Sequence, residues 1–224
     1  MHIMLLPLGD DNSDRVRKPI VNYLIIIVNL LVFFFFQKGG SNIKLTYSLS
    51  TVPAEILQKE DIFSLITSMF LHGGIAHIAG NMLFLFIFGD NIEDRIGHVR
   101  YLLFYLLCGI AGSLAHVYLS SIMGSNLNIP SLGASGAISG VLGGYILLFP
   151  RRRVRVLIFR IITQVPAFVA LGLWFVFQIV NGAGMLGGNS QGGGVAYAAH
   201  IGGFVFGLAV IRLFEIGTVY GKSG

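Results

Sequence analysis

Charged side chains are scarce in this sequence. Only 11% of the 224 residues are Asp, Glu, Lys or Arg, while 54% are hydrophobic; ordinary soluble domains carry about 25% charged residues. This shortage excludes an ordinary soluble globular protein and predicts a polytopic membrane protein. The net charge of +5 arises from cations spread over several loops, with no single basic face that could follow a phosphate backbone. Nucleic-acid binding is therefore not expected.

Cysteine is almost absent. Cys108 is the only one in the chain, so an intramolecular disulfide is impossible. Its place inside a hydrophobic stretch predicts an inert packing thiol.

Acidic residues are missing from the hydrophobic stretches. Every Asp and Glu falls in a loop, in a terminal segment or at the inner end of a predicted span. Acid proteolysis needs paired carboxylates in one site, and metal hydrolysis of the HExxH type needs two histidines four residues apart with a glutamate between them. The sequence has neither arrangement, so both mechanisms are disfavoured and no metal or other cofactor is expected.

Long hydrophobic runs, in contrast, cover most of the chain. A helix that crosses a bilayer needs about 20 mainly apolar residues. Six such spans are predicted, at 20–37, 74–89, 101–123, 133–149, 157–180 and 195–214. We therefore expect an all-α polytopic membrane protein, with a membrane domain at 20–214 and short cytoplasmic tails at 1–19 and 215–224.

The distribution of basic residues predicts the orientation. Short cytoplasmic loops collect Lys and Arg. Of the 15 such residues, only Lys38, Lys44 and Lys59 fall in loops on the other side. Both termini are therefore expected to be cytoplasmic. The bacterial inner (plasma) membrane is the simplest location, because no organelle-targeting segment precedes the first span.

Four polar residues inside the predicted spans lie at one depth. With cytoplasmic termini, the second, fourth and sixth spans all begin on the outer side. His77 and Asn81 lie near the start of the second span, Ser135 near the start of the fourth and His200 near the start of the sixth. At 1.5 Å per residue, all four lie within roughly 10 Å of the outer ends of their helices. Ionisable groups inside a membrane are costly and usually functional, so these residues form a candidate site.

Two readings of this site are open. Small residues recur every four positions at Gly136 and Gly140, next to Ser135, and again at Gly203 and Gly207. This pattern lets membrane helices pack closely, and on this reading Ser135 is merely another small residue at a helix contact. The other reading is serine catalysis.

Serine catalysis assigns a role to each polar residue. A serine hydroxyl is a weak nucleophile until a base removes its proton, and His200 is the histidine best placed to do so. Without a carboxylate at that depth, the site would be a dyad and not a triad. The backbone N–H of Ser135, the Asn81 amide and the His77 imidazole can donate to a developing oxyanion.

The motifs and their order resemble a known family. HGGIAHIAGN at 72–81, GASG at 133–136 and AHIGGFVFG at 199–207 lie on alternate predicted spans, and GDNIEDRIGHVRYLLFYL follows the second span. Together they resemble the rhomboid intramembrane serine proteases, over residues 18–214. Each motif alone is weak, but the ordered set is specific.

The resemblance implies a fold and an activity. It implies a six-transmembrane-helix rhomboid-like bundle around a water-filled cavity, gated by the fifth span and the glycine-rich 181–194 loop. It also implies Ser135 as nucleophile, His200 as general base, and Asn81 with His77 as oxyanion-hole donors. The implied partners are transmembrane protein substrates within the lipid bilayer, cut near the outer ends of their spans. The oligomeric state is not predicted.

The chain departs from the family pattern at two places. Many members carry a Trp-Arg pair in the first outer loop, whereas the only tryptophan here is Trp174, in the fifth predicted span. Many also have an aromatic residue against the catalytic histidine where this chain has Ser139. What orients the His200 ring is therefore open, and Tyr197 is a neighbouring candidate.

Two other function classes remain as alternatives. A catalytically silent rhomboid-like protein would bind membrane segments without cutting them, but the presence of both Ser135 and His200 argues against it. A small transporter would also place polar residues along an aqueous path. The lack of an intramembrane carboxylate, of a charged ring and of a clear inverted repeat disfavours it.

Overall fold

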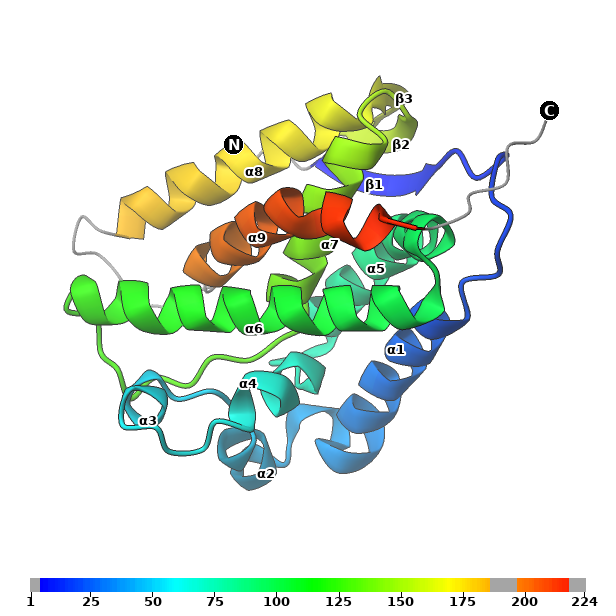
Figure 1. The fold of residues 1–224 in the computed structure, drawn as a ribbon. Helices are drawn as coiled ribbons and strands as arrows, with labels where there is room; N and C mark the ends of the chain where they lie inside the picture. The colour runs from blue at the N-terminus through cyan, green and yellow to red at the C-terminus, as the bar shows by residue number, and fades with distance from the viewer. Residues whose placement is uncertain (1–4, 186–196, 218–224) are drawn as a thin grey trace.

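The computed structural model describes residues 5–185 and 197–217, and most of them are helical. Figure 1 shows a bundle of long helices with short helices at one end and a small sheet at the other. The glycine-rich loop expected to cap the site lies mainly outside the described residues.

The long helices correspond to the hydrophobic runs. Three are long and apolar enough to cross a membrane, namely α5 (Ile75–Ile96), α6 (His98–Ile122) and α9 (Tyr197–Glu215). Shorter apolar helices correspond to the other predicted spans: α1 (Ile20–Leu31) with its π-helical end η1 (Val32–Phe36), α7 (Ser135–Leu148) and α8 (Ala167–Met185). Every predicted span thus contains a helix, but only three of the helices meet the length and hydropathy expected of a span.

Helix α7 forms the centre of the bundle (Figure 1). Its residues from Gly136 to Tyr145 are all buried, and it packs against α6 and α9 and also against α5 and α8. Glycine disfavours a helix in water by about 1 kcal/mol per residue relative to alanine. In a membrane the backbone must satisfy its own hydrogen bonds, so the glycine-rich segment stays helical and packs closely.

The glycines on α7 and α9 let the two backbones touch. A Cβ at Gly203 would overlap the carbonyl of Gly136, and a Cβ at Gly207 would overlap that of Gly140. On another face of α7, a Cβ at Gly140 would collide with Cys108 of α6, a free thiol that is fully buried. This backbone contact sets the first turn of α7 beside the first turn of α9.

Short helices join α1 to α5. They are the turn η2 (Lys38–Gly40), α2 (Ile43–Ser48), α3 (Pro53–Leu57), α4 (Ser64–Thr67) and the turn η3 (Ser68–Phe70). This connection is tied to the loop before α7, because Thr51 and Ser131 form an antiparallel bridge. The short helices therefore support the loop that leads into the candidate site.

A three-stranded antiparallel sheet lies at the opposite end of the bundle (Figure 1). Its strands are β1 (Leu5–Asp10), β2 (Arg153–Ile158) and β3 (Ile161–Pro166), with β2 in the middle. The all-α expectation is therefore wrong in this region, and so is the fifth predicted span up to Pro166. In RVRVLI, arginine alternates with valine, and Val154 and Val156 are fully buried. This two-residue period indicates a strand, and an averaged hydropathy conceals it.

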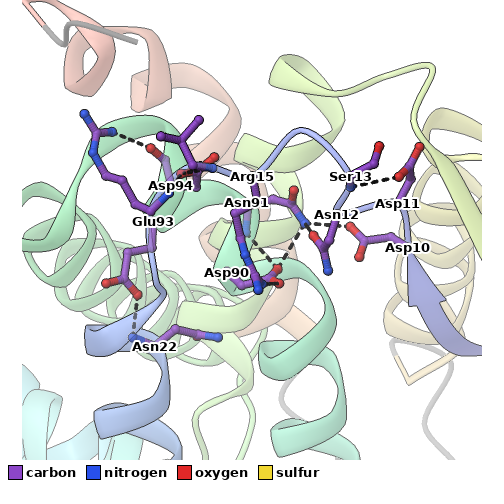
Figure 2. Close-up of polar contacts among 12 residues, drawn as sticks. Asp10, Asp11, Asn12, Ser13, Arg15, Asn22, Asp90, Asn91, Glu93 and Asp94 are labelled. Atoms are coloured by element: carbon purple, nitrogen blue, oxygen red, sulfur yellow. Dashed lines mark hydrogen bonds and ion pairs between the residues drawn. The ribbon is translucent and has the colours of Figure 1, made fainter. Parts of the chain in front are cut away.

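The segment expected to be an N-terminal tail is held against α5. Figure 2 shows polar side chains from the C-terminal part of α5 facing the N-terminal segment. Glu93, fully buried, accepts the backbone N–H groups of Val21 at 2.9 Å and Asn22 at 2.6 Å. The first N–H groups of a helix lack partners within the helix, so Glu93 caps α1 from outside. Arg15 donates to Asp90 at 2.7 Å and anchors the preceding residues.

Candidate active site

Ser135 is the first residue of α7, and the turn before it is fixed from two sides. Gly133 has a φ of +126°, which side-chain-bearing residues rarely adopt. Its N–H donates to the carbonyl of Ser68 at 2.9 Å. A Cβ at this position would lie 2.9 Å from Nε2 of His77. Glycine therefore allows the turn to pass the His77 ring and to place half-buried Ser135 at a helix N-terminus.

His200 lies in the first turn of α9, and its ring reaches Ser135. The Nε2 atom of His200 is 2.7 Å from Oγ of Ser135, although the residues are 65 positions apart in the chain. His200 is only 9% exposed, and Ser135 is half-buried. The structure thus brings together the two residues that the sequence analysis paired as nucleophile and base.

The other ring nitrogen of His200 also has a partner. Oε1 of Gln178, from α8, lies 2.8 Å from Nδ1 of His200. An amide oxygen is only an acceptor, so Nδ1 carries the ring proton and Nε2 is free to accept the proton of Ser135. This is the tautomer that a general base needs.

The sequence analysis missed Gln178. The available signal was a lone amide in the apolar run LWFVFQIV of the fifth predicted span, close to its outer end. A buried amide inside a membrane is costly unless it is hydrogen-bonded. That rule predicts a polar partner at the same depth, and His200 is at that depth.

Aromatic rings complete the surroundings of His200. The Trp174 ring lies with its centroid 6.1 Å from that of His200 at an interplanar angle of 32°, and the Tyr197 ring lies edge-on at 6.2 Å and 81°. Ser139 instead donates its hydroxyl to the carbonyl of Ser135 at 2.6 Å. The imidazole is thus held by Gln178 and two rings. The sequence analysis had noted Trp174 only as a departure from the family pattern.

His77 and Asn81 project from the outer part of α5. Nδ1 of His77 accepts the N–H of Gly73 at 3.3 Å, so the ring proton is on Nε2, the atom that faces Gly133. The ring of His72 packs edge-on against His77 at 5.2 Å. Nδ2 of Asn81 is buried and has no hydrogen-bond partner within the described residues. A buried donor without a partner costs about 1–3 kcal/mol, so this N–H is available to a ligand oxygen.

The described part of the chain offers no set of metal ligands. Within it, no three His, Cys, Asp or Glu side chains gather in a way that could hold a metal ion. The arrangement present is a serine hydroxyl, an oriented imidazole and nearby N–H donors.

The chain can now be compared with known proteins. Residues 59–215, well over half of the chain, match the family model of the rhomboid domain. The chain belongs to the rhomboid family. It is 35% identical over 211 residues to Rhomboid protease GluP of Bacillus subtilis, a match that covers 92% of this chain and 37% of that protein.

Other relatives come from eukaryotes. The chain is 33% identical over 156 residues to Rhomboid protein 1, mitochondrial, of Saccharomyces cerevisiae, covering 68% of this chain and 43% of that protein. It is also 33% identical over 184 residues to RHOMBOID-like protein 1 of Arabidopsis thaliana, covering 82% and 42% respectively. The chain spans less than half the length of these relatives.

Family membership confirms the resemblance and bears on where the protein is located. The rhomboid domain and the apolar helices indicate an integral membrane protein. Some relatives are named as mitochondrial proteins, so the expected bacterial inner membrane has no support. Relatives are named both as proteases and only as rhomboid-like proteins, so the argument for catalysis depends on the site.

Proposed function

We propose that this chain is an intramembrane serine endopeptidase that hydrolyses peptide bonds in or near the outer ends of transmembrane segments of its substrates. The observation that carries the proposal is the 2.7 Å contact between Oγ of Ser135 and Nε2 of His200. Its family relationship to Rhomboid protease GluP supports the same activity. The alternative is a catalytically silent rhomboid-like protein that binds membrane segments.

In the proposed mechanism, His200 acts first as base and then as acid. Nε2 takes the hydroxyl proton as Oγ of Ser135 attacks the scissile carbonyl carbon. The same proton passes to the leaving amine, and the carbonyl carbon remains bound to Oγ as an acyl-enzyme ester. His200 then activates a water that hydrolyses this ester and restores the hydroxyl.

The oxyanion would be stabilised by donors from two helices. The N–H of Ser135 lies at the start of α7, where the helix dipole favours negative charge. The Nδ2 of Asn81, which has no partner among the described residues, and the protonated Nε2 of His77 supply donors from α5. Donors that are already in place cost no reorganisation when the charge develops.

Helix length supports a site inside the bilayer. Helix α7 has 14 residues and is therefore roughly 21 Å long, shorter than the hydrocarbon core of about 30 Å. In the proposed six-span arrangement both termini are cytoplasmic, α7 ends near the cytoplasmic surface and Ser135 begins it below the outer surface. A substrate would have to unwind locally there, because a helical peptide bond hides its carbonyl.

Labelling with a fluorophosphonate tests the proposal directly. Such probes react with a serine only when its surroundings activate it. In purified protein, mass spectrometry should locate the adduct on Ser135, and both Ser135→Ala and His200→Ala should abolish it. Ser48→Ala, which changes an exposed serine of α2, should label as the wild type does.

The opposite results would separate the alternatives. Folded wild-type protein that does not label would contradict the protease and favour the silent binding protein. Labelling that persists in His200→Ala would remove His200 as the base.

A further inference from the structure

We propose that Gln178 is the positioning residue for His200, in the place that a carboxylate occupies in Ser–His–Asp triads. This inference rests on the proposed function, because it concerns how the same base is held. It assigns a role to a polar residue of α8, whereas the proposed nucleophile, base and oxyanion donors come from α5, α7 and α9.

The two ring nitrogens of His200 are bonded on opposite sides. Nδ1 faces Oε1 of Gln178 at 2.8 Å, and Nε2 faces Oγ of Ser135 at 2.7 Å. The amide accepts the Nδ1 proton, which leaves the lone pair of Nε2 directed at the serine hydroxyl. The same amide oxygen continues to accept a hydrogen bond when Nε2 gains its proton. Gln178 therefore selects the reactive tautomer and stabilises the protonated imidazole.

The hydrogen bond between Gln178 and His200 is buried. Gln178 is 6% exposed and His200 is 9% exposed, so water competes little for the hydrogen bond between them. Trp174 lies one helical turn before Gln178 and packs its ring near His200. Positions four apart share a helix face, so one face of α8 supplies both the acceptor and a flanking ring.

A purely structural role is the competing interpretation. Polar side chains often join membrane helices by hydrogen bonds, and Gln178 could serve only to dock α8 on α9. A docking role predicts lower stability when the bond is removed and no change in the reactivity of Ser135 in the protein that remains folded. A positioning role predicts lower reactivity of Ser135 in the folded protein at unchanged probe affinity, whether or not stability also falls.

Because Gln178 belongs to α8, its hydrogen bond to His200 depends on the position of that helix. Phe175 of α8 stacks on Phe204 of α9 with ring centroids 4.1 Å apart, in the same contact between the two helices. Any movement of α8 away from α9 would withdraw Gln178 from Nδ1. The base is therefore complete only when α8 lies against α9, and a substrate that displaced α8 would have to let it return before Ser135 reacts.

The test measures how fast a fluorophosphonate inactivates purified protein and separates the maximal rate, kinact, from the affinity, KI. Gln178→Met keeps the length of the side chain but removes the amide oxygen. We expect kinact to fall by about 10- to 100-fold, the effect of losing one hydrogen bond to a charged group, with KI unchanged. Gln178→Glu keeps an acceptor oxygen in either protonation state and should restore kinact to at least the wild-type value.

A matched control comes from the same helix. The side-chain amide of Asn181 donates to the carbonyl of Phe177 within α8 at 2.6 Å. Asn181→Leu should leave both kinact and KI as in the wild type. Thermal unfolding of each variant monitors the docking of α8. If Gln178→Met fails to fold, Gln178→Asn, which withdraws the amide by one methylene, replaces it with the same expected loss.

The outcomes separate this inference from the proposed function. If the wild type labels at Ser135 and Gln178→Met labels with the same kinact, Gln178 does not position His200 although the protease stands. A loss in Gln178→Met that Gln178→Glu fails to restore would also overturn the inference. If the wild type itself does not label, the proposed function fails first.

Discussion

At the scale of single residues, Asn81 offers the sharpest test of the oxyanion hole. Its buried Nδ2 has no partner within the described residues, so its removal should cost the fold little and the transition state much. Asn81→Ala is expected to lower the cleavage rate of a transmembrane substrate by about 10- to 1000-fold, as loss of one oxyanion donor does. Asn126→Ala, an exposed loop asparagine, is the control. An unchanged rate in Asn81→Ala would remove it from the hole.

Depth within the predicted spans was the information that made the proximity of Ser135 and His200 predictable. Counting residues from the start of each hydrophobic run places Ser135 and His200 in one layer, and the structure joins them at 2.7 Å. Gln178 lies near the outer end of its run as well, so its depth was also readable from the sequence. Its pairing was not, because which face of α8 turns toward α9 depends on packing between helices far apart in the chain.

At the scale of elements, the contact between α7 and α9 can be tested with two glycines. Gly207→Ala would press a methyl group into the backbone of Gly140, and overpacking of this kind costs about 1–3 kcal/mol. Gly172 in α8 has open space where a Cβ would be added. Gly172→Ala should therefore be neutral or stabilising by up to about 1 kcal/mol, because alanine favours a helix. Thermal unfolding in detergent measures both changes, and equal effects would contradict the close contact.

Positions of helices were predictable from hydrophobicity, while the sheet was not. Each predicted span contains a helix because a long apolar run has few other ways to satisfy its backbone in a membrane. Strand β3 and the last two residues of β2 lie in the apolar stretch that leads into α8, so they were merged into the fifth predicted span. The pairing of β2 with β1 joins residues such as Val154 and Asp10, and no local pattern reveals such a distant partner.

At the scale of the whole molecule, one polar cluster joins the N-terminal segment to the helix that carries Ser135. Oδ2 of Asp10, at the end of β1, accepts hydrogen bonds from Asn91 of α5 at 2.8 Å and from the hydroxyl of Tyr145. Figure 2 shows Asp10 and Asn91 facing each other. Arg152, just before β2, donates to Asn91 and to Asp14. The end of α7 remote from Ser135 is thus fixed by residues that were expected to form a tail.

This cluster should make stability depend on pH through Asp10. Burial raises the pKa of Asp10 from 3.8 to about 7, and the nearby Asp90 adds to the rise, while Tyr145 and Arg152 oppose it. The folded state then holds the proton more tightly than the unfolded state. The stabilisation is full below pH 3.8, declines as the pH rises and is lost above about pH 7.

Asp10→Asn imitates the protonated carboxyl at every pH. The variant should match the wild type near pH 4 and exceed its free energy of unfolding near pH 8 by on the order of 2–4 kcal/mol, since one pKa unit corresponds to about 1.4 kcal/mol. Unfolding midpoints measured across this range test the expectation.

The control is Asp11→Asn, because hydrogen bonds from Ser13 lower the pKa of this exposed carboxylate. Its removal should slightly destabilise the protein at pH 8, the opposite sign. The difference in free energy of unfolding between Asp10→Asn and the wild type could instead stay constant with pH. That result would mean that Asp10 is ionised in the folded protein and that the cluster holds the N-terminal segment as a charged network.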